Sequence, residues 1–238
     1  MSWKTQARDS KGRFLPKVVV TPPKVTRRKK EIIRQFNVFV IDDSVSIVYN
    51  KMVDSIKQGF NKIVNDVYEA NSDNKIEMHW GLSFFGRKHY SHYVYTPVAP
   101  GLSQYNPNQS CTALNDGIIY AIEKTQEYLN TRVGKANVVF NIFTDGEENN
   151  SGSSVQDVNK LIEQKKSEGW MINFIGGGDE TFVRKTADNY GIYQANTVSY
   201  GTNAVETTQV FDKMSKGMSS YTKAVKQRKV SNQGFFGN

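Results

Sequence analysis

The sequence of 238 residues contains only one cysteine, Cys111, so no disulfide bond can form within the chain. This scarcity favours a reducing compartment, and we expect a cytoplasmic location. Long apolar runs are also lacking, since none approaches the roughly 20 residues that a membrane-spanning helix needs. The basic N-terminal region has no apolar segment of the kind that forms the core of a secretory signal peptide. We therefore expect no membrane partner and no secretion through a classical signal peptide.

The excess of positive charge is confined to the two ends of the chain. Residues 1–31 contain ten Lys or Arg side chains against two acidic ones, which equals the net charge of +8 of the whole chain. Residues 223–238 add four more basic side chains and no acid. We expect a basic extended N-terminal arm (1–34), a folded domain (35–224) and a basic C-terminal tail (225–238). Any contact with nucleic acid or with acidic neighbours is then expected to involve these arms.

Two apolar periodicities alternate along the rest of the chain. Short apolar runs bounded by turn residues indicate buried strands, and apolar residues recurring every three or four positions indicate amphipathic helices. Strands that alternate with helices predict an α/β fold with a doubly wound, mostly parallel sheet and helices on both faces. The short connection at 86–88 predicts one antiparallel edge strand. We predict strands at 38–41, 76–85, 89–98, 138–143, 171–175 and 192–193, and helices at 47–70, after 111–113, after 154, at 181–190 and over 210–221.

Oxygen-bearing side chains follow two of the predicted strands and open one predicted helix. Asp42, Ser44 and Ser46 come directly after the strand at 38–41, Thr112 opens the second predicted helix, and Asp145 follows the strand at 138–143. In open α/β sheets, ligands bind beyond the carboxyl ends of the strands. Carboxylate and hydroxyl oxygens without histidine or thiolate are the ligands of hard cations such as Mg²⁺. These five side chains are therefore our candidate metal ligands.

The segments Asp42-x-Ser44-x-Ser46, Thr112 and Thr144-Asp145-Gly146, in this order, resemble the metal-ion-dependent adhesion site of the von Willebrand factor type A (vWA) domain. The resemblance covers about residues 35–224 and implies a vWA, Rossmann-like fold. It further implies Mg²⁺, with Mn²⁺ or Ca²⁺ as alternatives. Ser44, Ser46 and Thr112 would then ligate the ion directly, whereas Asp42 and Asp145 would bind it directly or through water. An Asp or Glu side chain of a protein partner would complete the coordination.

Some positions depart from the pattern of this family. Val45 stands where the family usually has glycine, and Ser110 and Cys111 stand where glycines often precede the threonine. None of the three positions supplies a ligand, so the departures concern loop shape and partner fit more than metal binding. Asp43 is an additional carboxylate, and we expect it to face solvent rather than to hydrogen-bond to a ligand.

Simpler interpretations exist for each part of the pattern. Asp and Ser after a strand commonly cap the following helix, so the DxSxS segment alone would not indicate a metal site. The glycines at 176–178 are expected to form a tight turn rather than a phosphate cradle, because GxGxxG and GKS/T are lacking. We expect His79 to be a core or edge residue, and His89 and His92 to lie on opposite faces of a strand rather than to form a metal pair. Phe235-Phe236 is either a docking peptide or a frayed end.

The resemblance implies a non-enzymatic protein-interaction module for adhesion or as an adaptor. A structural role in a large assembly, such as a bacteriophage virion whose neighbours the basic arms contact, is compatible with this function and gives a virion-associated location. One alternative is an adaptor subunit for a ring ATPase. Another is a metal-dependent phosphohydrolase in which Asp42 attacks phosphorus, but such sites need a second acid two positions on, where this chain has Ser44.

Overall fold

The computed structural model describes residues 32–87, 90–96, 100–103 and 105–237. The chain divides into two units, residues 1–31 and 32–238, and the described residues all belong to the second unit. The expectations for residues 1–31 of the N-terminal arm and for His89 lie outside the described residues, whereas Ile33 and Arg34, which were predicted to belong to the arm, are part of the first strand. None of the described helices is both long enough and apolar enough to cross a membrane.

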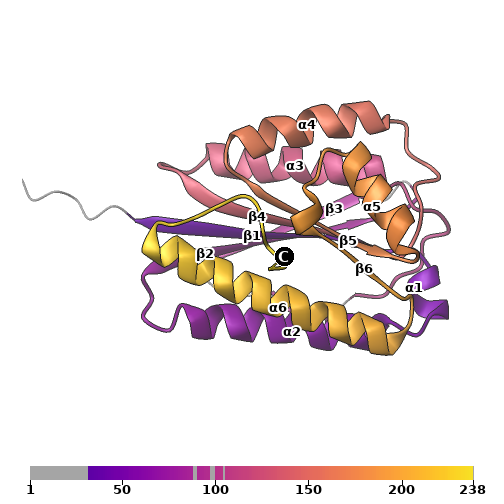
Figure 1. The fold of residues 1–238 in the computed structure, drawn as a ribbon, viewed down its shortest axis with the longest axis horizontal. Helices are drawn as coiled ribbons and strands as arrows, with labels where there is room; N and C mark the ends of the chain where they lie inside the picture. The colour runs from indigo at the N-terminus through magenta and orange to yellow at the C-terminus, as the bar shows by residue number, and fades with distance from the viewer. Residues whose placement is uncertain (1–31, 88–89, 97–99, 104, 238) are drawn as a thin grey trace, which may run out of the picture. The chain divides into compact units, whose positions relative to one another are not determined.

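The described chain forms a sheet of six strands in the order β3-β2-β1-β4-β5-β6 (Figure 1). Strand β3 runs antiparallel to β2, and all other neighbours are parallel. This arrangement confirms the predicted mostly parallel sheet with an antiparallel edge strand. The strands are β1 Ile33–Asp42, β2 Ile76–Phe85, β3 Tyr90–Tyr95, β4 Ala136–Thr144, β5 Met171–Gly177 and β6 Thr197–Tyr200.

Helices cover both faces of the sheet, as predicted (Figure 1). The pair α2 (Val53–Ala70) and α6 (Ala204–Gln227) lies on one face. The opposite face is covered by α3 (Leu114–Asn130), α4 (Val155–Ser167) and α5 (Glu180–Asn189). A one-turn helix, α1 (Ser46–Tyr49), follows β1, and a short 3₁₀ helix, η1 (Gln194–Asn196), precedes β6.

Strand β1 is the centre of two cores, because its side chains alternate between the faces of the sheet. Phe39 and Ile41 belong to the core under α2 and α6, and Val38 and Val40 belong to the core under α3, α4 and α5. All four are essentially inaccessible to solvent. Burial on both faces explains why the strand reads as an unbroken apolar run rather than as an alternating one.

Helices α2 and α6 approach each other closely at Gly59. A Cβ atom at this position would lie 2.4 Å from Cβ of Phe211 in α6, so only glycine permits the observed contact. The apolar face of α2 is thereby pressed against α6 and against the sheet below them, which fixes the layer under β1.

Two predicted elements are wrong in detail. The helix predicted at 47–70 is interrupted between α1 and α2, where Lys51 adopts a left-handed conformation with φ of 56°. The strand predicted at 192–193 does not form, since Ile192 is a buried residue of the turn after α5 whose amide donates to Ala187 O at 2.9 Å. The last strand is instead β6, and its four residues are too few and too mixed in polarity to give a clear signal.

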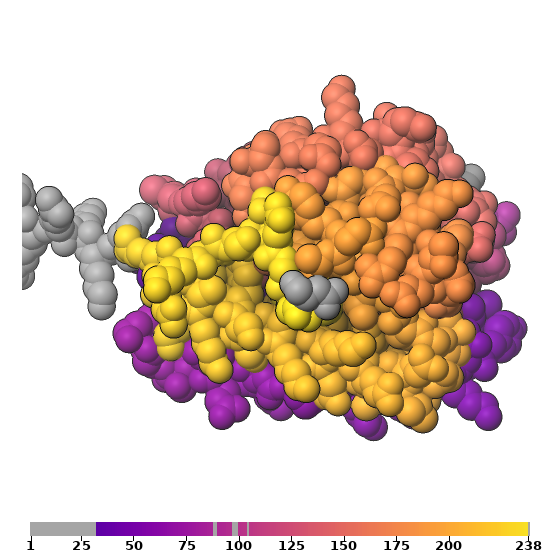
Figure 2. All heavy atoms as spheres, viewed as in Figure 1, coloured from indigo at the N-terminus to yellow at the C-terminus, as the bar shows by residue number. Residues whose placement is uncertain are grey.

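The C-terminal residues fold back onto the domain, so both expectations for Phe235 are wrong. The ring of Phe235 is only 6% exposed and lies against Gly217 of α6. Its amide donates to Asn196 Oδ1 at 3.1 Å, and Asn196 Nδ2 donates to Asn232 O at 2.9 Å. In Figure 2 the yellow residues after α6 accordingly lie over the orange surface of the domain. These partners are remote in sequence, which is why the tail appeared to have nothing to pack on.

Candidate metal centre

The candidate ligands lie where the sheet reverses its order of strands. β1 and β4 are parallel neighbours, and their carboxyl ends meet with Ile41 opposite Phe143. The chain continues from β1 to β2 on one side, whereas β4 lies on the other side, which makes this edge the topological switch point of the sheet. Asp42 ends β1 and Asp145 follows β4, so both carboxylates belong to this crevice.

Three oxygen atoms of the predicted set form a compact triangle. The hydroxyl oxygens of Ser44 and Ser46 lie 2.8 Å apart. Ser46 Oγ donates to Asp145 Oδ1 at 2.9 Å, and Ser44 Oγ lies 3.4 Å from the same carboxylate oxygen. Adjacent ligands of an octahedral Mg²⁺ are about 3.0 Å apart, given Mg–O distances of about 2.1 Å. The triangle therefore has the dimensions of one face of such an octahedron.

Asp42 is fully buried and fixed by two hydrogen bonds. Its Oδ1 accepts from the amide of Ser44 at 2.8 Å, and its Oδ2 accepts from Thr144 Oγ1 at 2.6 Å. Burial raises the pKa of this carboxyl to about 7, although its hydrogen bonds oppose the shift. Asp42 thus connects the loop after β1 to the end of β4 and adds a second carboxylate to the site.

Asp145 is half-buried, and burial also raises the pKa of its carboxyl. Its Oδ2 accepts from Asn50 Nδ2 at 3.2 Å. Two carboxylates withdrawn from water are costly when both are ionised, and the described residues that donate hydrogen bonds to them do so through hydroxyl and amide groups rather than cationic side chains. A bound cation would remove this cost, so the electrostatics fit a metal site.

Thr112 reaches the site from the loop before α3. Its amide donates to Asn149 Oδ1 at 3.0 Å, and its carbonyl accepts from the amide of Asn149 at 3.1 Å. Gly146 directly follows Asp145, and a Cβ atom added to Gly146 would lie 3.3 Å from the Thr112 hydroxyl oxygen. The hydroxyl is therefore close to the turn after Asp145. Although Thr112 is only 4% exposed, its hydroxyl makes no hydrogen bond with any described residue, which leaves it available as a ligand.

The structure therefore brings the five predicted residues to one crevice. Ser44, Ser46 and Asp145 are in direct contact, Asp42 contacts the same loop, and Thr112 adjoins the turn after Asp145. Within the described residues, no group of three or more His, Cys, Asp or Glu side chains is placed to hold a metal ion. The candidate centre differs from such groups because it combines two carboxylates with three hydroxyls, a donor set that fits a hard divalent cation.

Two positioning residues were not identified in the sequence. Asn50 donates to Asp145, and it arrives there only because the one-turn helix α1 ends at Tyr49. Gly177 lies in β5, and a Cβ there would be 2.8 Å from Cα of Asp145. The expected tight turn thus begins only at Gly178, with φ of 108°, while Gly176 and Gly177 complete a strand that packs against Asp145 in the loop after β4.

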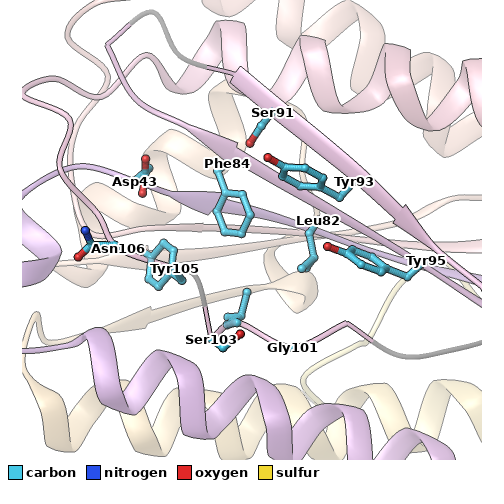
Figure 3. A pocket seen from close by; sticks show the side chains of 11 residues that line it. Asp43, Leu82, Phe84, Ser91, Tyr93, Tyr95, Gly101, Ser103, Tyr105 and Asn106 are labelled. Carbon is cyan, nitrogen blue, oxygen red and sulfur yellow. The ribbon is translucent and has the colours of Figure 1, made fainter.

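The remaining candidates have other roles. His79 is a core residue, as predicted, and its Nδ1 lies 2.8 Å from the Tyr128 hydroxyl. His92 Nδ1 lies 2.6 Å from Ser83 Oγ, and burial lowers the pKa of His92 to about 4. Asp43 is half-buried and lines a cavity beside the metal centre, so the expectation that it simply faces solvent is wrong (Figure 3).

No protein-family model matches the sequence, and no curated protein matches it closely enough to be a relative. Solved structures do match. SpaC, a pilus adhesin from Lactobacillus rhamnosus GG, aligns with a TM-score of 0.59 and 13% identity over 81% of this chain and 31% of its own. Proximal thread matrix protein 1 from the mussel byssus was solved with zinc in its metal-ion-dependent adhesion site (MIDAS) motif. It aligns with a TM-score of 0.53 and 15% identity over 76% of this chain and 47% of its own length.

The SpRpn10 VWA domain aligns with a TM-score of 0.53 and 15% identity, over 75% of this chain and 94% of its own. This chain therefore spans less than half of the byssus and pilus proteins but nearly all of the isolated domain. Identities this low establish the arrangement of the backbone and nothing finer. The described part of the chain has the fold of a von Willebrand factor type A domain.

Proposed function

We propose that this chain is a non-enzymatic, Mg²⁺-dependent protein-interaction module that binds an Asp or Glu side chain of a partner. The observation that carries the proposal is the triangle of Ser44, Ser46 and Asp145 oxygens, with edges of 2.8, 2.9 and 3.4 Å, beside the buried Asp42. Proximal thread matrix protein 1, which has the same fold, has a zinc-occupied metal-ion-dependent adhesion site, and this supports a divalent cation here. Mn²⁺ and Ca²⁺ are alternatives with the same ligand preference.

The ligand set suits the capture of an anion. The two serines and Thr112 contribute neutral oxygens, and the carboxylates of Asp42 and Asp145 balance the double charge of one ion. A bound Mg²⁺ would supply an open coordination position for the partner's carboxylate. Because these five side chains carry no more negative charge than the ion balances, they do not themselves repel the incoming acid.

Phosphohydrolase chemistry fits the geometry poorly. A nucleophilic aspartate must present one oxygen to its substrate. Asp42 has no exposed surface, and both of its carboxylate oxygens already accept hydrogen bonds, from Ser44 and Thr144. These contacts support a role for Asp42 in shaping the site rather than in attack on phosphorus.

The proposal is tested by capture of a partner from lysate of the native source, once with Mg²⁺ and once with EDTA. We expect the immobilised wild-type chain to retain a protein only in Mg²⁺, and Ser44→Ala to lose it, because the substitution removes one corner of the oxygen triangle. Ser72→Ala, which changes an exposed turn hydroxyl away from the site, serves as the matched control. Equal capture in Mg²⁺ and EDTA, or by Ser44→Ala, would contradict the proposal.

A further inference from the structure

A cavity of about 330 Å³ lies at the antiparallel edge of the sheet (Figure 3). Side chains alternate along β3, so Ser91, Tyr93 and Tyr95 share one face, and the pairing with β2 places Phe84 opposite Ser91 and Leu82 opposite Tyr93. Part of the chain between β3 and α3 closes the other side. The volume falls at the lower end of the range of about 300–1,000 Å³ for pockets that bind small molecules.

Aromatic rings form an angled wall in this cavity. Phe84 stacks on Tyr105 with ring centroids 5.6 Å apart and planes inclined by 23°, whereas Tyr93 is inclined to Phe84 by 59°. The hydroxyl of Tyr105 donates to Asp42 O, which holds this ring in place. Because Phe84 and Tyr105 already pack against each other, they leave no slot in which a flat ring could be sandwiched. A ligand can instead lie against an open face such as that of Tyr93, which is 50% exposed.

Hydroxyl and amide groups surround these rings. Five lining side chains carry such groups and make no hydrogen bond with any described residue: Ser91, Tyr93, Tyr95, Ser103 and Asn106. Each hydroxyl both donates and accepts hydrogen bonds, and an amide has two donor hydrogens and an accepting oxygen. A matching ligand therefore carries several groups that also donate and accept. An aromatic side chain of a partner has at most one polar group, so it would leave most of the lining without partners, at a cost.

The charges around the cavity select neither sign. Asp43 lines one end, and Lys57 Nζ donates to Ser103 O at the rim at 3.5 Å. A carboxylate is thus accompanied by an ammonium group, and neither an anion nor a cation gains a clear advantage. The described lining accordingly fits a neutral ligand.

We propose that this cavity binds a neutral sugar ring, a pyranose, either as a free sugar or at the end of a glycan. A pyranose has a face of C–H groups that packs on an aromatic ring, whose negative face attracts the slightly positive hydrogens. Around its edge it carries hydroxyls that donate and accept, as the hydroxyls and the amide of the lining do. Binding uses none of the five candidate metal ligands, so the inference goes beyond the proposed function and does not depend on it.

The proposal is tested by NMR titration of the full chain in EDTA. The probes are the methyl glycosides of glucose, galactose, mannose and N-acetylglucosamine. Sorbitol, which has hydroxyls but no rigid C–H face, and adenosine, which has a flat ring, are the comparisons. We expect a glycoside to shift the amide signals of Leu82, Tyr93 and Tyr95 and to bind at least about fivefold tighter than sorbitol and adenosine. Shifts by none of the glycosides, or equal binding of sorbitol or adenosine, would overturn the proposal.

Two variants separate the ring from the hydroxyls. Tyr93→Leu should weaken binding of the responding glycoside at least about fivefold, because it removes the exposed ring. Ser91→Ala should weaken it about threefold through the loss of a hydrogen-bonding partner, and the change is too small to disturb the strand. Tyr193→Leu, outside the cavity, should bind like the wild type. Binding that survives both cavity substitutions would overturn the proposal.

An array of neutral glycans, probed with the labelled full chain in EDTA, distinguishes the two sources of the sugar. Neutral glycans are used so that the basic residues 1–31 do not contribute through charge. Binding to glycans that share a terminal sugar would assign the cavity to glycan ends. Binding of a methyl glycoside in solution, with no response on the array, would assign it to free sugars. An absence of both would contradict the proposal and leave the proposed metal-dependent function unaffected.

Discussion

Replacing Asp145 by Asn raises the dissociation constant for Mg²⁺ at least about 100-fold and leaves the fold intact. The substitution keeps the shape of the side chain, but it removes the charge of the carboxylate whose Oδ1 accepts from Ser46 at 2.9 Å. Isothermal titration calorimetry with Mg²⁺ and Mn²⁺ measures the loss. Because burial already disfavours the ionised form of Asp145, we expect the metal-free variant to unfold within about 1 kcal/mol of the metal-free wild type.

Asp212→Asn is the matched control for this variant. Asp212 lies on α6, is about half exposed and pairs with Lys62 at 3.7 Å, away from the candidate centre. We expect it to bind Mg²⁺ like the wild type, since an exposed ion pair contributes little. Wild-type affinity in Asp145→Asn, or equal losses in both variants, would show that Asp145 is not a ligand.

Replacing Phe60 by Ala lowers the free energy of unfolding by about 3–5 kcal/mol. Phe60 is fully buried in α2, and its ring meets Phe39 of β1 at 5.0 Å and Trp80 of β2 at 6.4 Å, both edge to face. The substitution leaves a cavity in the core under α2 and α6. This core supports β1, the strand that ends at Asp42. Urea denaturation followed by circular dichroism measures the change.

Phe182→Ala tests whether this effect depends on burial. Phe182 lies on α5 and is 40% exposed, so its removal should cost about 1 kcal/mol or less. Similar losses for the two variants would mean that the core under α2 and α6 does not stabilise the domain as the packing indicates.

The fold and the meeting of the candidate ligands at one crevice were predictable because their signals are local. Strands β1, β4 and β5 each contain a short, largely apolar run, and each candidate ligand follows a strand or precedes a helix within a few residues of it. Parallel strands align their carboxyl ends, so the convergence of Asp42 and Asp145 follows from the order of the elements. Proximity in space could thus be inferred without a contact being seen.

The remaining features depend on contacts between distant segments. The break before α2 arises from a left-handed Lys51, a conformation that nothing in its residue type requires. Gly177 reads as part of a turn until β5 is seen to pack on Asp145. Phe235 appeared unsupported because its partners are Gly217 and Asn196. The cavity beside Asp43 is likewise assembled from two strands and a loop, and no single stretch of sequence encodes it.

The central claim is that one divalent cation binds between the loops that follow β1 and β4. Anomalous diffraction from crystals of this chain grown with Mn²⁺ tests it most directly. We expect a single strong peak within about 2.6 Å of the hydroxyl oxygens of both Ser44 and Ser46, and no such peak in Ser44→Ala. A map without a peak at this edge of the sheet at millimolar Mn²⁺, or with its only peak elsewhere, would contradict the account.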